Sequence, residues 1–203
     1  KYRKIIMPAS QLKINGIVNQ KKFYGLNLIF TSFPDIKYVA TIDCESFLNK
    51  SFNVFDKFEQ IFQNGYVKAN KSLKGGDIIK NLAKLLSPAI NYKNLEKKTQ
   101  DFSLYWWFNE LCVYERITFL DFYNWYLKLE NYKYLISNYW CFDYLLYTLF
   151  LIDKNLFTIK LVTSPDHFFE FGALEQNFDN NISSSFQSAI DRNPLAVNKK
   201  YNL

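Results

Sequence analysis

The sequence predicts a helix-rich α+β fold, one domain with extended N- and C-terminal arms. Two patterns predict this class: stretches with apolar residues at three- and four-residue spacing, and short runs of β-branched and aromatic residues bounded by turn residues. At 203 residues, 49% hydrophobic and 19% aromatic, the chain is long enough to bury a core and too aromatic to be wholly disordered. We expect a basic arm at residues 1–22, a globular domain at residues 23–176 and an extension at residues 177–203.

The first elements expected after the arm are two strands. Residues 1–22 are basic and show no helical periodicity. Residues 23–30 and 36–42 are rich in β-branched and aromatic residues, and Pro34 and Asp35 between them favour a turn. A β-hairpin is therefore expected.

A helix is expected next. Ser51 is a suitable N-cap, Gly65 is a suitable stop, and between them phenylalanines recur at helical spacing. The expected apolar face consists of Phe52, Phe55, Phe58 and Phe62.

Residues 70–76, Asn-Lys-Ser-Leu-Lys-Gly-Gly, precede a second amphipathic run that Pro88 closes. Lysines and paired glycines before a helix can cradle a phosphate, because the first amides of a helix are unpaired. The segment lacks the Gly-x-x-x-x-Gly-Lys-Ser/Thr residue order of a phosphate-binding loop, however. As the N-cap, the Asp77 carboxylate would itself occupy the anion position. We favour a structural role and keep an RNA or lipid phosphate as the alternative. The apolar positions are Ile78, Ile79, Leu82, Leu85 and Leu86.

Two further helices are expected between residues 101 and 130. Asp101 is the expected cap of the first, and Thr118 with Asp121 forms a variant capping box for the second. We interpret their aromatic residues as core and interface positions, because a base-stacking surface would need interleaved basic residues. The first helix is expected to contain Trp106, Trp107, Leu111 and Val113, and the second Leu120, Tyr123, Trp125, Tyr126 and Leu127.

The segment from Tyr134 to Ile152 is the one candidate for a membrane span. Its nine Leu, Ile and Phe residues contribute about −4 kcal/mol on an insertion scale, whereas Asp143 costs about 2.5 to 3.5 kcal/mol. A buried helix is favoured, with a spanning helix as the alternative. Inside a bilayer, Asp143 would need a partner.

The remaining residues suggest a strand, a helix start and a tail. Phe157, Ile159 and Leu161 alternate with polar residues, and Ser164, Pro165 and Asp166 resemble a helix N-terminus. The histidine, His167, has Asp166 and Glu170 nearby, which are too few ligands for a metal. We expect the polar tail to become ordered on a partner.

Composition limits the functional classes. The net charge of +6 is carried almost entirely by lysine, without a long basic run, so RNA contact is allowed but not required. Cys44, Cys112 and Cys141 are widely spaced and odd in number, which favours free thiols in a reducing compartment. Residues 1–8 look like neither a secretory signal nor an import presequence, so either a targeting segment has been removed or the protein is made where it works. We expect no catalytic, cofactor-binding or metal site and no enzyme activity.

Nearly half of the residues are Phe, Tyr, Ile, Asn and Lys, whose codons are rich in A and T. This composition, with aromatic runs at residues 121–127 and 139–144, resembles proteins encoded in ciliate mitochondrial genomes. The resemblance implies a respiratory-chain subunit or a mitochondrial ribosomal protein. We expect a non-catalytic accessory subunit of an inner-membrane respiratory complex, bound to other subunits, with membrane association through residues 134–152 as an open question. The alternative is a ribosomal protein of the mitochondrial matrix that contacts rRNA through its lysine-bearing arms, including residues 1–22 and Lys199 with Lys200.

Overall fold

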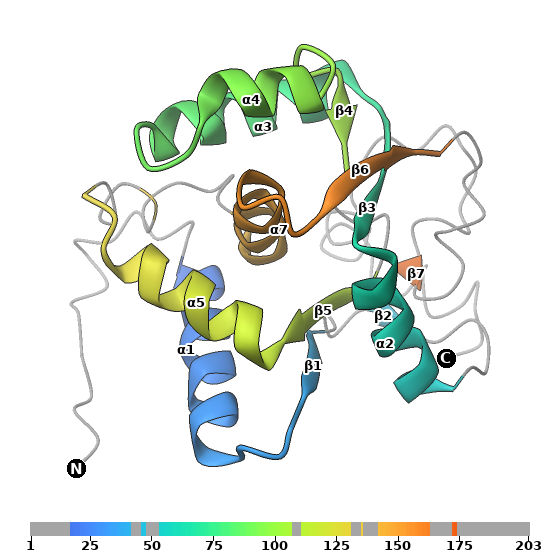
Figure 1. Ribbon diagram of the computed structural model, residues 1–203, viewed down its shortest axis with the longest axis vertical. Helices are drawn as coiled ribbons and strands as arrows, with labels where there is room; N and C mark the ends of the chain where they lie inside the picture. The colour runs from blue at the N-terminus through green and yellow to red at the C-terminus, as the bar shows by residue number, and fades with distance from the viewer. Residues whose placement is uncertain are drawn as a thin grey trace, which may run out of the picture.

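The computed structural model describes residues 17–41, 46–47, 53–106, 111–130, 135, 142–162 and 172–173. Within these ranges it confirms a helix-rich α+β fold (Figure 1). The helices are α1 (Ile17–Ser32), α2 (Val54–Asn64), α3 (Leu73–Leu86), α4 (Tyr92–Lys98), α5 (Arg116–Leu127) and α7 (Asp143–Asp153). The strands are β1 (Tyr38–Thr41), β2 (Ser46–Phe47), β3 (Tyr66–Lys71), β4 (Leu104–Tyr105), β5 (Cys112–Glu115), β6 (Thr158–Leu161) and β7 (Gly172–Ala173).

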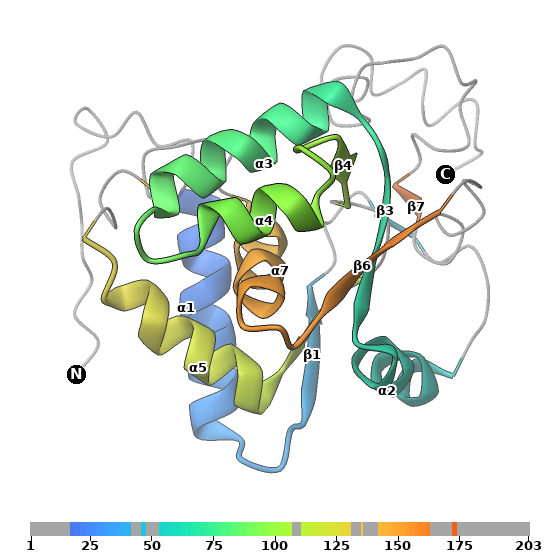
Figure 2. The same ribbon diagram turned by 45° about the horizontal axis from the view of Figure 1, so that its top comes forward.

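Helix α7 is the centre of the fold, with α1 and α5 packed on one side and α3 and α4 on the other (Figures 1 and 2). Every residue from Asp143 to Ile152 is buried. A helix that is apolar all round carries no helical periodicity and needs neighbours on every side. Its surroundings, and not its own amphipathicity, therefore determine its position.

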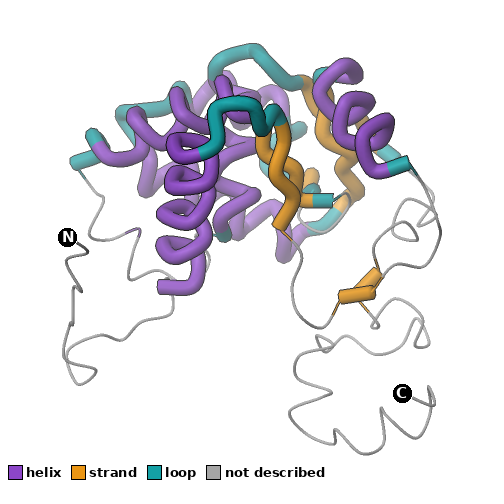
Figure 3. The backbone as a smooth tube through the Cα atoms, turned by 90° about the horizontal axis from the view of Figure 1, so that it is seen from below, coloured by secondary structure: helices purple, strands orange, loops and turns teal. Residues whose placement is uncertain are grey.

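The strands form three small sheets; α2 lies across the two larger ones from the other helices, and the β2–β7 pair lies apart (Figure 3). In the three-stranded sheet, β3 is central, antiparallel to β4 and parallel to β6. The pair β1–β5 is antiparallel, with Tyr38 opposite Glu115, and β2 pairs with β7. Strand β5 runs directly into α5, so this ladder fixes where α5 begins.

The expected hairpin at residues 23–30 and 36–42 is wrong. Residues 23–30 belong to α1, and β1 pairs with β5 instead. Phe23, Leu26 and Phe30 follow helical spacing and are buried. Exposed Tyr24 and Leu28 obscured that period in the sequence. Helix α1 also begins at Ile17, inside the expected arm, whose residues 1–16 lie outside the described ranges.

Helices α2 and α3 are confirmed, but their caps differ from those expected. Asn53 caps α2, Gly65 ends it at a φ of 60°, and Ser51 lies outside the described residues. Phe55 points away from the core and is 82% exposed. Ser72, not Asp77, caps α3, because its Oγ accepts a hydrogen bond from the Gly75 amide.

The helix expected from Asp101 through Trp106 to Val113 is also wrong. Residues 104–105 form β4 and residues 112–115 form β5, while residues 107–110 are outside the described ranges. Asp101 has a φ of 56°, in the left-handed region, which cannot start a helix. Backbone pairing has overridden the helical pattern of these residues.

Helix α5 is confirmed, but without the expected capping box. It begins at Arg116, and its N-cap, Glu115, makes no side-chain capping bond. The Thr118 hydroxyl instead lies 2.5 Å from the Tyr147 hydroxyl on α7. The strand expected after Asn155 is confirmed as β6. The expected helix start at residues 164–166 and the tail at residues 177–203 lie outside the described residues.

An aromatic cluster between α1, α5 and α7 forms much of the core. The Phe23 ring centroid lies 5.1 Å from those of both Phe122 and Tyr126 in edge-to-face geometry. Phe122 in turn lies 5.5 Å from Tyr147 and 5.7 Å from Phe150. Aromatic pairs at this spacing contribute about 0.5–1.5 kcal/mol each beyond simple burial. The cluster therefore holds three helices in fixed positions.

Candidate functional site

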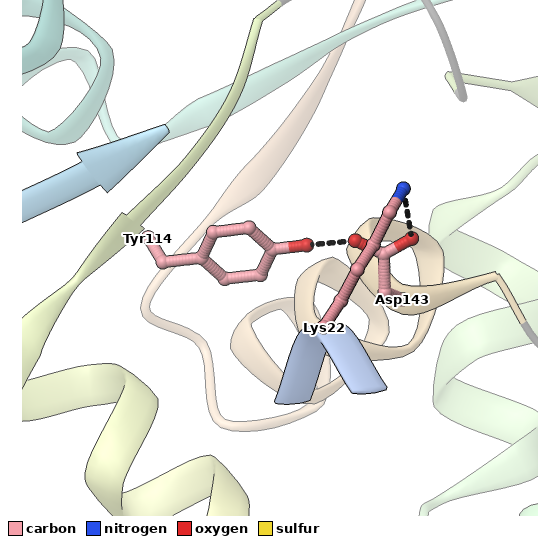
Figure 4. Close-up of polar contacts among 3 residues, drawn as sticks. All are labelled: Lys22, Tyr114 and Asp143. Carbon is pink, nitrogen blue, oxygen red and sulfur yellow. Dashed lines mark hydrogen bonds and ion pairs between the residues drawn. The ribbon is translucent and has the colours of Figure 1, made fainter. Parts of the chain in front are cut away.

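The best-defined polar group of the described residues lies at the start of α7. Asp143 is its first residue and is only 4% exposed. The hydroxyl of Tyr114 on β5 donates a 2.5 Å hydrogen bond to Asp143 Oδ2 (Figure 4). The Lys22 ammonium on α1 lies 3.4 Å from Oδ1. We call these three residues the Asp143 cluster.

Each member reaches the cluster from a different element. Asp143 lies in the first turn of α7, where the helix dipole favours a negative charge. Tyr114 lies on the β1–β5 ladder opposite Val39 and is fully buried. Lys22 precedes the buried Phe23, and its side chain, 27% exposed, runs along the edge of the core toward the carboxylate.

The electrostatics of the cluster favour a neutral tyrosine beside a carboxylate that is paired with Lys22. Burial first, and the charge of Asp143 second, raise the pKa of Tyr114 well above its ordinary value. Tyr114 therefore keeps its proton and donates a hydrogen bond to Asp143. A buried carboxylate needs such partners, since an unpaired one costs several kcal/mol.

Two more polar contacts anchor the next turn of α7. The indole Nε1 of Trp106 donates to Thr148 Oγ1 at 2.7 Å, and Thr148 donates to the Tyr144 carbonyl oxygen at 2.7 Å. The Tyr147 hydroxyl contacts Thr118 and accepts a 3.4 Å hydrogen bond from the Glu115 amide. These bonds satisfy buried polar groups within the protein, which is a structural role.

A cleft of about 270 Å³ lies elsewhere, between the end of α3 and the end of α5. No member of the Asp143 cluster lines it. An acid and a tyrosine can pass a proton where a substrate reaches them, but neither Asp143 nor Tyr114 lines this cleft. The residues that line the cleft are Leu85, Leu86, Ser87, Pro88, Ala89, Trp125, Lys128, Leu129 and Glu130.

The glycines considered as a phosphate cradle have a packing role. Gly75 and Gly76 are buried in the first turn of α3. A Cβ on Gly76 would lie 1.6 Å from the Phe102 carbonyl oxygen, and one on Gly75 would lie 2.3 Å from the Tyr105 ring. The Gly76 amide donates to the Ser72 carbonyl oxygen at 2.8 Å. Residues 102–105 therefore pack against both glycines, and the Gly75 and Gly76 amides already donate hydrogen bonds to Ser72.

The structure describes only some of the other candidate site residues. Cys112, on β5, is a free thiol, and Cys44 and Cys141 lie outside the described residues. His167, Asp166 and Glu170 lie outside them as well. Among the residues that the structure does describe, no three His, Cys, Asp or Glu side chains are grouped as metal ligands.

The membrane candidate, residues 134–152, is described at residue 135 and from residue 142 onward. Its helix, α7, is 11 residues long and buried inside the protein. Across the described residues, no helix combines the length and the apolar character that a membrane span requires.

The sequence predicts a partner for Asp143 only inside a bilayer and does not identify that partner. Lys22 is 121 residues away and Tyr114 is 29 residues away. An aspartate inside an apolar run is the only sequence signal here, and it does not say which lysine or tyrosine will approach.

Comparison of the chain with protein-family models, curated proteins and solved structures found no match.

Proposed function

We propose that this protein is a non-catalytic accessory subunit of a mitochondrial inner-membrane respiratory complex, which holds neighbouring subunits in place. The resemblance in composition limits the assembly to two kinds. The way in which the fold uses its surface and its interior supports a scaffold.

The observation that carries the proposal is the exposure of large apolar side chains on α1 and α5. Tyr24 and Leu28, four residues apart on α1, are 58% and 43% exposed. Ile117 and Leu127 on α5 are 70% and 49% exposed. Large apolar side chains on two neighbouring helices are typical of a surface that another protein covers.

The interior supports the same role. The Asp143 cluster and the Trp106–Thr148 bond use their polar groups to position α7. Such bonds make the protein rigid. Each donor or acceptor in them already has a partner within the protein, so it is not available to act on a substrate. A rigid body with an apolar face is suited to bridging other subunits.

Native electrophoresis tests the proposal. Mitochondrial membranes are solubilised in a mild detergent, and the protein is detected by antibody in a native gel. Comigration with a haem-containing respiratory complex is the expected result. Recovery as a free monomer from intact complexes would contradict it.

A second candidate function is a subunit of the mitochondrial ribosome. The observation that favours it is charge: residues 1–22 contain six basic residues and no acid, which suits contact with RNA phosphates. Sedimentation with ribosomal subunits and release at high salt would support this candidate. Comigration with a respiratory complex would exclude it.

A further inference from the structure

The positive charge of the folded domain is concentrated in one stretch. Residues 68–100 contain eight lysines and two acids, a net charge of +6 that equals the net charge of the whole chain. Apart from this stretch and residues 1–22, the chain has 11 basic and 17 acidic residues, a net charge of −6. The two signs are therefore segregated along the sequence.

The fold turns this stretch into a surface, which we call the lysine face: Lys80, Lys84, Lys93 and Lys97. Each pair is four residues apart, so each lies on one side of its helix, α3 or α4. Lys84, Lys93 and Lys97 are exposed and Lys80 is half-buried. None of the four forms an ion pair with a described acid.

The lysine face and the exposed apolar residues of α1 and α5 are carried by different helices. Helices α3 and α4 lie across α7 from α1 and α5 (Figures 1 and 2). Lys98, on the same helix as Lys93 and Lys97, has a different role: its ammonium donates to the Ile152 carbonyl oxygen at 2.6 Å. Lys98 therefore stabilises the packing of α4 against α7, whereas Lys93 and Lys97 are exposed.

We propose that the lysine face docks on a membrane surface of anionic phospholipids. The inference rests on the proposed function, since it supplies the contact between an accessory subunit and the bilayer beside it. A negative lipid surface attracts each nearby lysine and increases the affinity about fivefold per residue. The two lysine pairs on the packed helices α3 and α4 supply this attraction.

Leu73 favours a lipid partner over RNA. It is 82% exposed and precedes Lys80 by seven residues and Lys84 by eleven, so the three lie along one stripe of α3, which also carries the exposed Asp77. An apolar side chain beside lysines gains by entering the headgroup region, whereas a phosphate backbone offers it nothing. Tyr92, the aromatic residue at the start of α4, packs on Phe102 with centroids 5.2 Å apart and is not free to stack on a base.

Vesicle co-sedimentation of the full chain tests the inference. Binding is expected to phosphatidylcholine vesicles that contain phosphatidylglycerol, and not to phosphatidylcholine alone. The double variant Lys93→Gln/Lys97→Gln should weaken this binding about 25-fold. The matched control Lys21→Gln/Lys37→Gln removes two exposed lysines from other elements and should weaken it less than about threefold. Equal losses in both variants, or no binding to anionic vesicles, would overturn the inference.

Leu73→Ser separates lipid from RNA. It should weaken vesicle binding by about tenfold, because it removes the apolar contribution but no charge. Binding to a duplex RNA oligonucleotide that Leu73→Ser leaves intact and Lys93→Gln/Lys97→Gln abolishes, without vesicle binding, would overturn the membrane assignment and favour an RNA partner.

A native gel of the same proteins separates this inference from the proposed function. If the protein comigrates with a respiratory complex but does not bind anionic vesicles, the docking inference fails and the proposed function stands. If it binds the vesicles through the lysine face but never comigrates with such a complex, the proposed function fails and the docking surface stands.

Discussion

The Tyr114 hydroxyl and the Asp143 carboxylate, 2.5 Å apart, join strand β5 to the first turn of α7. Because β5 continues directly into α5, this bond also fixes α7 against the helix that packs beside it. Lys22 adds a contact from α1. One buried carboxylate thus connects three elements that are distant in sequence.

Replacing Asp143 with alanine should lower the free energy of unfolding by about 3 kcal/mol, because it leaves the Tyr114 hydroxyl buried without an acceptor. Urea unfolding at neutral pH measures the loss. Asp121→Ala, at an exposed position on α5, is the control and should change stability by less than about 0.5 kcal/mol. Equal effects of the two substitutions would show that the cluster does not stabilise the fold.

Tyr147 predicts a dependence on alkaline pH. Burial raises the pKa of Tyr147, so the folded state keeps this proton at a pH where the unfolded chain releases it. Its contribution to stability is therefore complete below about pH 10 and decreases by about 1.4 kcal/mol per pH unit above that value. Tyr147→Phe should cost about 1 kcal/mol at neutral pH, since Thr118 and the Glu115 amide both lose their contact with the Tyr147 hydroxyl.

The difference between wild type and Tyr147→Phe should therefore shrink between about pH 7 and about pH 11, because only the wild type has this proton to lose. Urea unfolding at both values provides the measurement. The other buried tyrosines titrate alike in both proteins and cancel. A difference that stays constant would mean that Tyr147 titrates normally in the folded state.

Gly76 should be the least replaceable glycine of α3. A Cβ there would lie 1.6 Å from the Phe102 backbone oxygen, so Gly76→Ala must push the chain apart and should cost more than about 3 kcal/mol. Gly25→Ala is the matched control in α1, where no atom lies within 4 Å of the new Cβ. It should raise the unfolding free energy by about 0.5–1 kcal/mol through helix propensity. Thermal unfolding of both variants tests this, and a tolerated Gly76→Ala would show that residues 102–105 do not pack on α3.

Lys97 and Lys98 are neighbours with different expected roles. The Lys98 ammonium donates to the Ile152 carbonyl oxygen and, at 2.7 Å, to Asn155 Oδ1, at the C-terminal end of α7. Lys98→Met keeps the aliphatic stem and should cost about 1–2 kcal/mol of stability. Lys97→Met should leave stability within about 0.5 kcal/mol and weaken only binding to anionic vesicles. If the two variants have the same stability, the role assigned to Lys98 is wrong.

The sequence predicts those helices and strands whose structure depends on the spacing and end residues of the segment itself. Gly65 ends α2 because its φ of 60° lies in the left-handed region that glycine adopts easily. The helical spacing of Ile79, Leu82 and Leu86 marks the buried face of α3. The alternation of Phe157 and Ile159 identified β6 in the same way.

The sequence prediction is wrong for segments whose structure depends on contacts with distant residues. Helix α1 was mistaken for a strand because Tyr24 and Leu28 are apolar yet exposed. Residues 104–105 and 112–115 carry a helical pattern, but β3 and β1 pair with them. The packing role of Gly76 depends on Phe102, which a distant turn brings against it. No local signal contains this information.

The Asp143 cluster was predictable only in part. The sequence predicts a partner for Asp143 only inside a bilayer, whereas the partners that the structure shows lie within the protein itself. Lys22 and Tyr114 were not identifiable as partners of Asp143. Lys22 lies in the segment that the sequence predicts as an arm, but the structure has helix α1 there. Tyr114 lies on strand β5, where the sequence pattern predicts a helix.

The central claim, that this protein is an accessory subunit of a respiratory complex, is tested most directly by what purifies with it. The native protein is captured from mild-detergent extracts at high salt, and the bound proteins and RNA are identified. The account predicts haem-bearing respiratory subunits in fixed ratio to the protein, together with phospholipid. Capture of ribosomal RNA and ribosomal proteins without respiratory subunits would contradict it.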